Sequence, residues 1–391
     1  MVQAMSLFNQ LLQHFPVPEF AALVKKHGAE RASKGFSCRT QLVAMLFCQL
    51  AHADSLRDIC NGLACCVGKL IHLGIGVAPN KSTLSYANQH RPAKLYEDLF
   101  YSALARFREE KGLGQRKCRF RFKNKLLSLD STTISLCLEM FPWASFRRAK
   151  GGVKAHVLLD HDDYMPSYVL ITEARRSDVK MADAFPLNPG SIVAMDRGYN
   201  DYSLFGDWTE RKIFFVTRLK DAAAYEVLAE GPVPANRKIR SDQLIQFSGG
   251  KAQQDCPFPL RRVVAWDAVN EREIVLLTNH LEFGSTTIAA IYKDRWEIEL
   301  FFKALKQNLK VKSFVGTSEN ALRIQIWTAL IAILLLKWMY HLSKAKWSLS
   351  NLASMLRMNL FTYRELSAWL DNPFGTPALL PVSQQLTLGL G

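Results

Sequence analysis

A chain of 391 residues is long enough for two or three domains with a sizeable buried core. Apolar residues make up 49% of it and charged residues 22%, which excludes a fibrous repeat and long disordered stretches. Fifty Lys and Arg against 35 Asp and Glu give a net charge of +15 with neutral His, which favours a polyanionic partner: DNA, RNA or an anionic membrane surface. Charge alone leaves a basic protein without such a partner equally open.

The first residues lack the basic start and the sustained apolar run of a signal peptide. The most apolar stretch, Ile326 to Leu336, is shorter than the ~20 residues of a membrane span, so we expect a buried core helix. Eight scattered Cys form no CxxC pair with matching partners, which predicts neither a disulfide framework nor a zinc site. Together these features predict a protein of the reducing cytoplasm with no membrane partner.

Residues 1–115 predict a helical domain, because apolar residues recur there at helical spacing and no strand pattern competes. Within it, Asn80 to Arg91 forms a short polar segment with Asn80 or Ser82 as a possible N-cap. Its Asn, Gln, Arg and Ser side chains suit base edges. The segment is therefore either a recognition helix or a solvated helix face, and position and charge suggest that the domain binds DNA ends.

A basic segment, Arg116 to Lys125, follows with six cations, no acid, and Phe120 and Phe122 between them. As a linker it would track phosphates. As an edge strand it would put cations on one face and aromatic rings in the core. We expect a basic lead-in strand that also meets DNA.

From Leu126 the pattern changes to short β-branched and apolar runs, typical of strands. Three of them predict an antiparallel meander at residues 126–138, 154–160 and 167–173. A helix, the buried strand 191–195, a second helix and the strand 213–219 follow. Three strands, helix, strand, helix, strand is the order of an RNase H-like α/β core.

The remaining chain predicts a strand-rich insertion at 219–284 and then mostly helices. In the insertion, Trp266 is either a core residue or a base-stacking residue. Long helices are expected over 286–311 and 321–342. The predicted division begins with a helical domain at 1–115. An RNase H-like core follows in two parts, 116–218 and 285–345, on either side of the insertion at 219–284. A C-terminal helical segment covers 346–391.

Three acids stand out by position. Asp130 lies in the middle of an apolar strand, where an ionised carboxylate is costly unless it faces a partner or a metal. Asp196 ends the buried strand 191–195, at the edge where open α/β sheets build their sites. Glu299 lies on a helix whose polar stripe occupies one arc beside an apolar arc. The stripe comprises Tyr292, Arg295, Glu299, Lys303 and Lys306, and a solvated face with i,i+4 ion pairs is its alternative interpretation.

The spacing Tyr292, Arg295, Glu299, Lys306 matches the Y-(2)-R-(3)-E-(6)-K signature of the insertion-sequence-four (IS4-like) family of bacterial DDE transposases. The surrounding RWEIELFFKALKQ also resembles that family, as do LLSLDSTTISL around the first aspartate and VAMDRGYND around the second. The resemblance covers about residues 115–345, and the helical region before it is similar to a domain of unassigned function that often precedes this core.

The resemblance implies a DDE triad of Asp130, Asp196 and Glu299 that holds two Mg²⁺ ions, for which Mn²⁺ can substitute. It implies that Arg295, Lys303 and Lys306 hold phosphates of a transposon end, and that Tyr292 hydrogen-bonds a phosphate near the cut. The expected partners are the terminal inverted repeats and the target DNA, both double-stranded, with a dimer in the synaptic complex. The expected place is the cytoplasm, at the nucleoid.

The expected reaction is cut-and-paste transposition by metal-dependent hydrolysis and strand transfer. A nuclease without strand transfer and an inactive DNA-binding derivative are the alternatives.

Other candidate site residues rank lower. His156 suits a core histidine, and the acidic turn of His161, Asp162 and Asp163 suits an ordinary hairpin connection. The remaining candidates are basic residues expected in flexible loops that could touch DNA: Arg147, Arg148, Lys150, Arg175 and Arg176.

Overall fold

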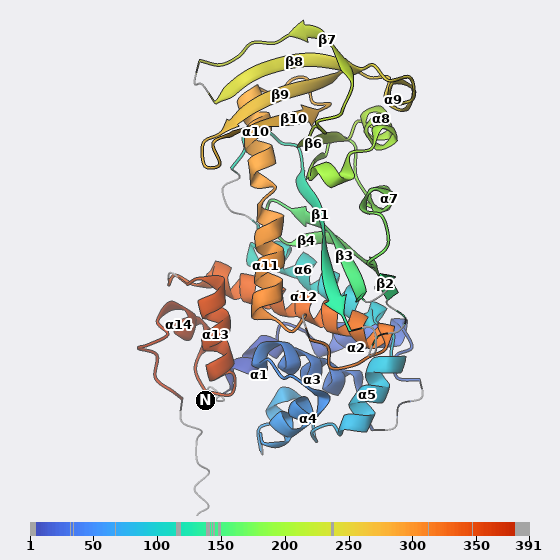
Figure 1. Cartoon of the computed structure of the whole chain (residues 1–391). Coiled ribbons are helices and arrows are strands. Elements are labelled where there is room, and N and C mark those ends of the chain that lie inside the picture. Colours follow the sequence, from blue (N-terminus) through green and yellow to red (C-terminus); the bar gives the residue numbers. More distant parts are fainter. Residues whose placement is uncertain are drawn as a thin grey trace, which may run out of the picture. The chain divides into compact units, whose positions relative to one another are not determined.

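The computed structural model is a mixed α/β protein. Helices form the N-terminal and C-terminal parts of the sequence, and the middle of the sequence forms a large sheet (Figure 1). It divides into two compact units, Met1–Leu113 with Lys303–Gly391, and Gly114–Phe302. The residues described are 5–31, 33, 35–66, 68–114, 119–137, 141, 143, 145–147, 150–235, 238–311, 313–345 and 347–379.

The first unit is helical, as the sequence predicts for its N-terminal part. Its elements are α1 (Leu7–Leu12), α2 (Val17–Lys26), α3 (Cys38–Ala51), α4 (Leu56–Ala64), η1 (Ile71–Leu73), α5 (Lys81–His90), α6 (Lys94–Lys111), α12 (Glu319–Leu342), α13 (Leu349–Asn359) and α14 (Leu366–Asp371). Side-chain caps begin several of them; Asn80 accepts from Thr83 N at 2.8 Å and starts α5, the expected polar helix.

Helix α12 is the centre of this unit and packs on α3, α5, α6 and α13. By length and composition it could cross a membrane, but 89% of its most apolar 18-residue window is buried inside the protein. The prediction of a buried core helix at Ile326 to Leu336 is confirmed.

The second unit is built on one sheet of ten strands. These are β1 (Leu126–Leu136), β2 (Ser145–Arg147), β3 (Lys150–Asp160), β4 (Pro166–Glu173), β5 (Ile192–Met195), β6 (Phe214–Arg218), β7 (Tyr225–Glu230), β8 (Ile239–Phe247), β9 (Leu260–Asp267) and β10 (Arg272–Thr278). The expected meander is present, because β3 pairs antiparallel with both β1 and β4. Strands β1, β5 and β6 are parallel neighbours.

The insertion extends this sheet. Strand β10 pairs antiparallel with β6, and β9, β8 and β7 follow in order, as the upper strands of Figure 1 show. The apolar runs RRVVAWD and REIVLLTNH, which predict strands in the sequence, contain β9 and β10, whereas β7 and β8 were not predicted. Five of the six residues of β7 are exposed, so the strand lacks the apolar alternation that reveals a strand in a sequence.

Each face of the sheet buries its own apolar cluster. On one face, Val193 and Met195 pack with residues of α8 (Tyr202–Glu210) and with the segment after α7 (Asp178–Ala182). On the other face, Ile192 and Ala194 pack with Ile288 and Ile291 of α10 (Ser285–Asp294). Alternate residues of β5 therefore face opposite helices, which explains why this strand reads as a continuous apolar run.

Two local predictions are wrong. No strand forms over the described residues 119–125 of the basic segment. The rings of Phe120 and Phe122 stack there with their centroids 5.1 Å apart, and both pack with the apolar cluster on the α10 side of the sheet. Arg116 lies outside the described residues. The expected loop at 147–152 contains paired backbone, since Arg147 belongs to β2 and Lys150 to β3. Arg148 is outside the described residues.

The helix expected over 286–311 is interrupted. Helix α10 ends at Asp294, and α11 (Glu297–Asn308) begins after the two residues Arg295 and Trp296. Arg295 keeps right-handed helical dihedral angles, φ −49° and ψ −30°, so the side chains on either side of the interruption keep nearly the phase of one helix.

Candidate active site

The sheet brings the two predicted aspartates together. Strands β1 and β5 are parallel with Leu129 opposite Met195, so Asp130 and Asp196 each follow the last paired residue of neighbouring strands. Adjacent strands lie ~4.8 Å apart, and residues two apart share a face. Asp130 therefore shares the face of Leu126, and Asp196 that of Ala194, which is the face that α10 covers.

Arg295, at the junction of α10 and α11, links the third acid to the first. Arg295 Nη1 lies 3.7 Å from Asp130 Oδ2, and Arg295 Nη2 donates to Glu299 Oε1 at 2.8 Å. The guanidinium also lies over the Tyr292 ring, 5.5 Å from its centroid. Tyr292, Arg295 and Glu299 of the predicted stripe thus face the aspartates in one unit.

Negative charge is concentrated at Asp130. The pKa of its carboxyl is raised from 3.8 to about 6. Burial is the largest cause, and the charges of Asp196 and Glu299 act in the same direction, while the Ser131 N–H and Arg295 lower the pKa. Burial also raises the pKa of the Tyr292 phenol. Asp196 is less enclosed, and its Oδ2 accepts from Gly198 N at 3.4 Å, where it caps the short helix η3 (Arg197–Tyr199). Three carboxylates close enough to oppose each other's ionisation are typical of a cation site.

The donor chemistry suits a hard divalent cation, because all three acids supply carboxylate oxygens. Among the described residues, however, no group of three His, Cys, Asp or Glu side chains lies around a single point ready to hold an ion. The Arg295 guanidinium is 10% exposed and provides the positive charge between Asp130 and Glu299. Metal binding would require Glu299 to exchange this arginine for the ion.

The two lysines of the stripe, Lys303 and Lys306, lie further along α11, in the part that belongs to the helical unit. Lys303 is exposed and lies four residues, about one turn, after Glu299. The charge of Glu297 contributes to the raised pKa of Tyr164, whereas the acids that raise the Asp130 pKa are Asp196 and Glu299.

The weaker candidates have structural partners. His156 is fully buried, with Nε2 2.9 Å from Thr172 Oγ1, which agrees with a core histidine. Asp162 pairs with Lys125 at 2.5 Å, and Arg175 with Glu173 at 2.5 Å. The core interpretation of Trp266 is wrong: its side chain is 37% exposed, and the Arg240 guanidinium lies 5.3 Å from the ring.

Next to the acids, Ser128, His161 and Asp294 form a hydrogen-bonded chain that the sequence did not predict, although His161 was a lower-ranked candidate. They come from three distant segments, so no spacing rule could connect them. The one available signal was a histidine followed by two acids in a turn, which is common in hairpins.

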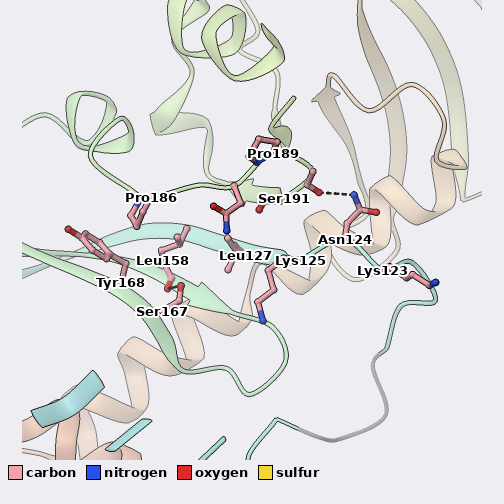
Figure 2. Close-up of a pocket in the computed structure, with 12 residues that line it drawn as sticks. Lys123, Asn124, Lys125, Leu127, Leu158, Ser167, Tyr168, Pro186, Pro189 and Ser191 are labelled. Atoms are coloured by element: carbon pink, nitrogen blue, oxygen red, sulfur yellow. Dashed lines mark hydrogen bonds between the residues drawn. The ribbon is translucent and has the colours of Figure 1, made fainter. Parts of the chain in front are cut away.

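A cavity of about 510 Å³ opens elsewhere in this unit (Figure 2). It lies near the beginning of β1 and β5, whereas Asp196 follows the end of β5. Leu127, Leu158 and Tyr168 line it, and Asn124 Nδ2 donates to Gly190 O at 2.7 Å on its rim. None of the predicted site residues lines this cavity.

Comparison with known proteins agrees with the geometry. Residues 121–335, more than half of the chain, match the family described as a transposase DDE domain, and residues 3–76 match a domain of unknown function, DUF4372. The chain is 30% identical over 296 residues to a protein described as a transposase, y4zB, of Sinorhizobium fredii, covering 75% of this chain and 80% of that protein.

Two further relatives are described as transposases for insertion sequence elements. The one for IS5377 of Geobacillus stearothermophilus is 30% identical over 60% of this chain and 62% of its own length. The one for IS4SA of Synechocystis is 26% identical over 66% of this chain and 70% of its own. The chain belongs to the DDE-domain transposases of insertion sequences, enzymes that cleave and transfer DNA strands.

Proposed function

We propose that Asp130, Asp196 and Glu299 are the catalytic, metal-binding triad of this transposase. The observation that supports this most strongly is the shared face: Asp130 and Asp196 follow the same register position of parallel neighbours, and Glu299 joins them through Arg295. We further propose an RNase H-like core, supported by the strand order β4-β3-β1-β5-β6 with an antiparallel first half and parallel β1, β5 and β6.

The three carboxylates would hold two Mg²⁺ ions, or Mn²⁺ in their place, as oxygen ligands. When bound, such ions lower the pKa of an attacking water or 3′-hydroxyl and stabilise the leaving oxygen. The chain's own contribution is to orient the acids and neutralise them. Arg295 does both, because its guanidinium contacts Asp130 and Glu299 and stacks on Tyr292. With Glu299 as a metal ligand, the same guanidinium would be available to a phosphate.

The proposed DNA contacts are Tyr292, Arg295, Lys303 and Lys306 near the cut and the helical unit further along the transposon end. That unit carries 23 Lys and Arg against 11 Asp and Glu, whereas the other unit carries 27 against 24. Most of the net positive charge that would attract double-stranded DNA, +12 of +15, therefore lies outside the sheet unit.

Helix α5 is the proposed base-reading element of the helical unit. It contains no acid, buries Leu84, Ala87 and Asn88, and exposes Ser85 and Gln89 on the opposite side. Amide and hydroxyl side chains pair with base edges in the major groove. Gln89→Ala should reduce the preference for the cognate terminal repeat over random DNA, and equal binding to both by the wild-type protein would reject this role.

We propose cut-and-paste transposition in the bacterial cytoplasm, at the nucleoid. Hydrolysis would free a 3′-hydroxyl at the transposon end, and that hydroxyl would then attack target DNA, with two ends joined in a dimeric synaptic complex. A nuclease that never joins strands and an inactive DNA-binding derivative are the competing functions. The intact acids argue against the derivative, since clustered anions hinder binding to a polyanion.

A supercoiled plasmid carrying the element's ends, incubated with protein and Mg²⁺, tests the three functions. Joined products support the transposase, cuts without joining support the nuclease, and a mobility shift alone supports the derivative. Glu299→Ala should abolish cleavage and leave end binding within a few-fold, while the matched Glu297→Ala variant stays active. An inactive Glu297→Ala with an active Glu299→Ala would refute the assigned triad.

A further inference from the structure

A buried chain of hydrogen bonds lies beside the proposed triad. Ser128 Oγ is 2.6 Å from His161 Nε2, and His161 Nδ1 is 2.7 Å from Asp294 Oδ2. Arg119 pairs with the other Asp294 oxygen, and the Tyr164 hydroxyl is 3.5 Å from Oδ2. The side chains of His161 and Asp294 are only 5% and 2% exposed. The His161 ring therefore bridges the Ser128 hydroxyl and the Asp294 carboxylate, each through one of its two nitrogens.

Serine, histidine and aspartate in this order resemble a nucleophile with its base. Ser128 is fully buried, however, so no substrate can reach its hydroxyl. The chain of hydrogen bonds is therefore a structural connection and not a second active site.

Its ends identify what it connects. Ser128 precedes Asp130 by two residues on β1 and lies on the same face of the sheet. His161 follows β3 in the turn before β4. Asp294 is the last residue of α10, directly before Arg295. The connection thus joins the strand that carries the first acid to the point where the helix with the third acid begins.

The connection can restrain the helix junction because Asp294 is a buried carboxylate. Burial raises its pKa, but the hydrogen bonds and charges of His161 and Arg119 outweigh this, and the net pKa is below the ordinary value. An ionised group in such a place is stable only while its partners stay in position. Movement of α10 away from His161 would take from this buried carboxylate its buried partner and leave it the more exposed Arg119. The pair therefore restrains the helix junction against β1.

We propose that His161 and Asp294 are positioning residues that hold the α10–α11 junction, and with it Arg295 and Glu299, at the distance from Asp130 that catalysis needs. The inference rests on the proposed function of the three acids. Displacement of a catalytic group by about 1 Å can lower a rate about 100-fold, which is the loss expected here.

The test compares Asp294→Asn and His161→Ala with Asp242→Asn in the full-length protein. Asp242 is a matched control, because it is also a 2% exposed carboxylate, paired with Arg261 at 2.5 Å on β8 and β9. Hydrogen exchange of the backbone amides at 295–299 reports on the junction without any cleavage. Plasmid cleavage and binding of the terminal repeat are measured in parallel.

Asp294→Asn and His161→Ala should accelerate exchange at 295–299 and reduce cleavage about 100-fold, with end binding changed less than about threefold. His161→Asn keeps an amide donor toward Asp294 and should restore part of both losses. Asp242→Asn should leave exchange and cleavage unchanged.

Unaltered exchange or wild-type cleavage in Asp294→Asn would overturn the proposal, as would equal losses in Asp242→Asn. A wild-type protein that never cleaves would reject the proposed function, while the exchange data would still decide whether the connection exists.

Discussion

At the scale of single residues, the first aspartate determines most of the behaviour expected of the site. Asp130 is the acid whose ionisation is opposed both by burial and by two like charges. A carboxylate in such an environment lowers stability in the metal-free protein, as strained functional groups do. The same three groups that oppose each other without metal would all favour a bound divalent cation.

Asp130→Asn should therefore stabilise the metal-free protein at pH 8. The folded-state pKa is about 6 against an ordinary 3.8, so the folded protein keeps a proton that the unfolded chain loses, and stability falls as pH rises through this interval. The asparagine variant avoids that loss and should gain on the order of 2 kcal/mol in free energy of unfolding at pH 8. Below about pH 4 the gain should vanish. Urea unfolding at several pH values measures it, and a variant less stable than the wild type at pH 8 would contradict the assigned environment.

At the scale of elements, much of the sheet could be predicted because period-two patterns and apolar runs mark β1, β3, β4, β5 and β6. The features that could not be predicted have physical causes. Strand β7 is exposed and gives no pattern, and the interruption after Asp294 coincides with a tertiary contact to His161 that no local spacing encodes. Asp130 and Asp196 were found by their positions in apolar strands and Glu299 through a spacing signature. The closeness of the two aspartates required the register of β1 with β5.

Helix α12 contains a polar residue whose role also lies in distant contacts. Gln325 is fully buried; its Nε2 donates to Lys310 O and Ser313 O, both at 2.8 Å, and its Oε1 accepts from Val315 N at 2.9 Å. Gln325→Leu would leave these backbone groups without their partner. We expect a loss of about 3 kcal/mol in free energy of unfolding, since each unpaired buried group costs about 1–3 kcal/mol.

Arg323→Ala on the same helix is the control for this loss. Its ion pair with Glu319 is an exposed i,i+4 contact of 2.7 Å and should contribute less than about 0.5 kcal/mol. Similar effects of the two substitutions in chemical denaturation would show that Gln325 does not hold the neighbouring backbone.

At the scale of the whole molecule, charge and chemistry are divided between the two units. The helical unit has a net charge of +12 and the sheet unit, with all three acids, of +3. A molecule built in this way can attract DNA with one unit and keep a less positive surface around carboxylates that must take up divalent cations. Helix α11 belongs to both units and carries Glu299 and Lys306.

Lys306→Ala should weaken binding to the terminal repeat and reduce the salt dependence of that binding by about one unit of slope in log K against log salt. Lys180→Ala, an exposed lysine of α7 in the sheet unit, is the control and should leave the slope unchanged. Binding titrations at several salt concentrations measure this slope. An unchanged slope in Lys306→Ala would show that this lysine does not contact a phosphate.

The central claim is that three acids from β1, the end of β5 and α11 share divalent cations. Its most direct test is the anomalous scattering of crystals of this protein soaked in Mn²⁺. We predict peaks within about 2.5 Å of carboxylate oxygens of Asp130 and Asp196, with Glu299 turned from Arg295 toward them. Peaks absent from these acids, or found only on other carboxylates such as Asp162 and Asp163, would contradict the account.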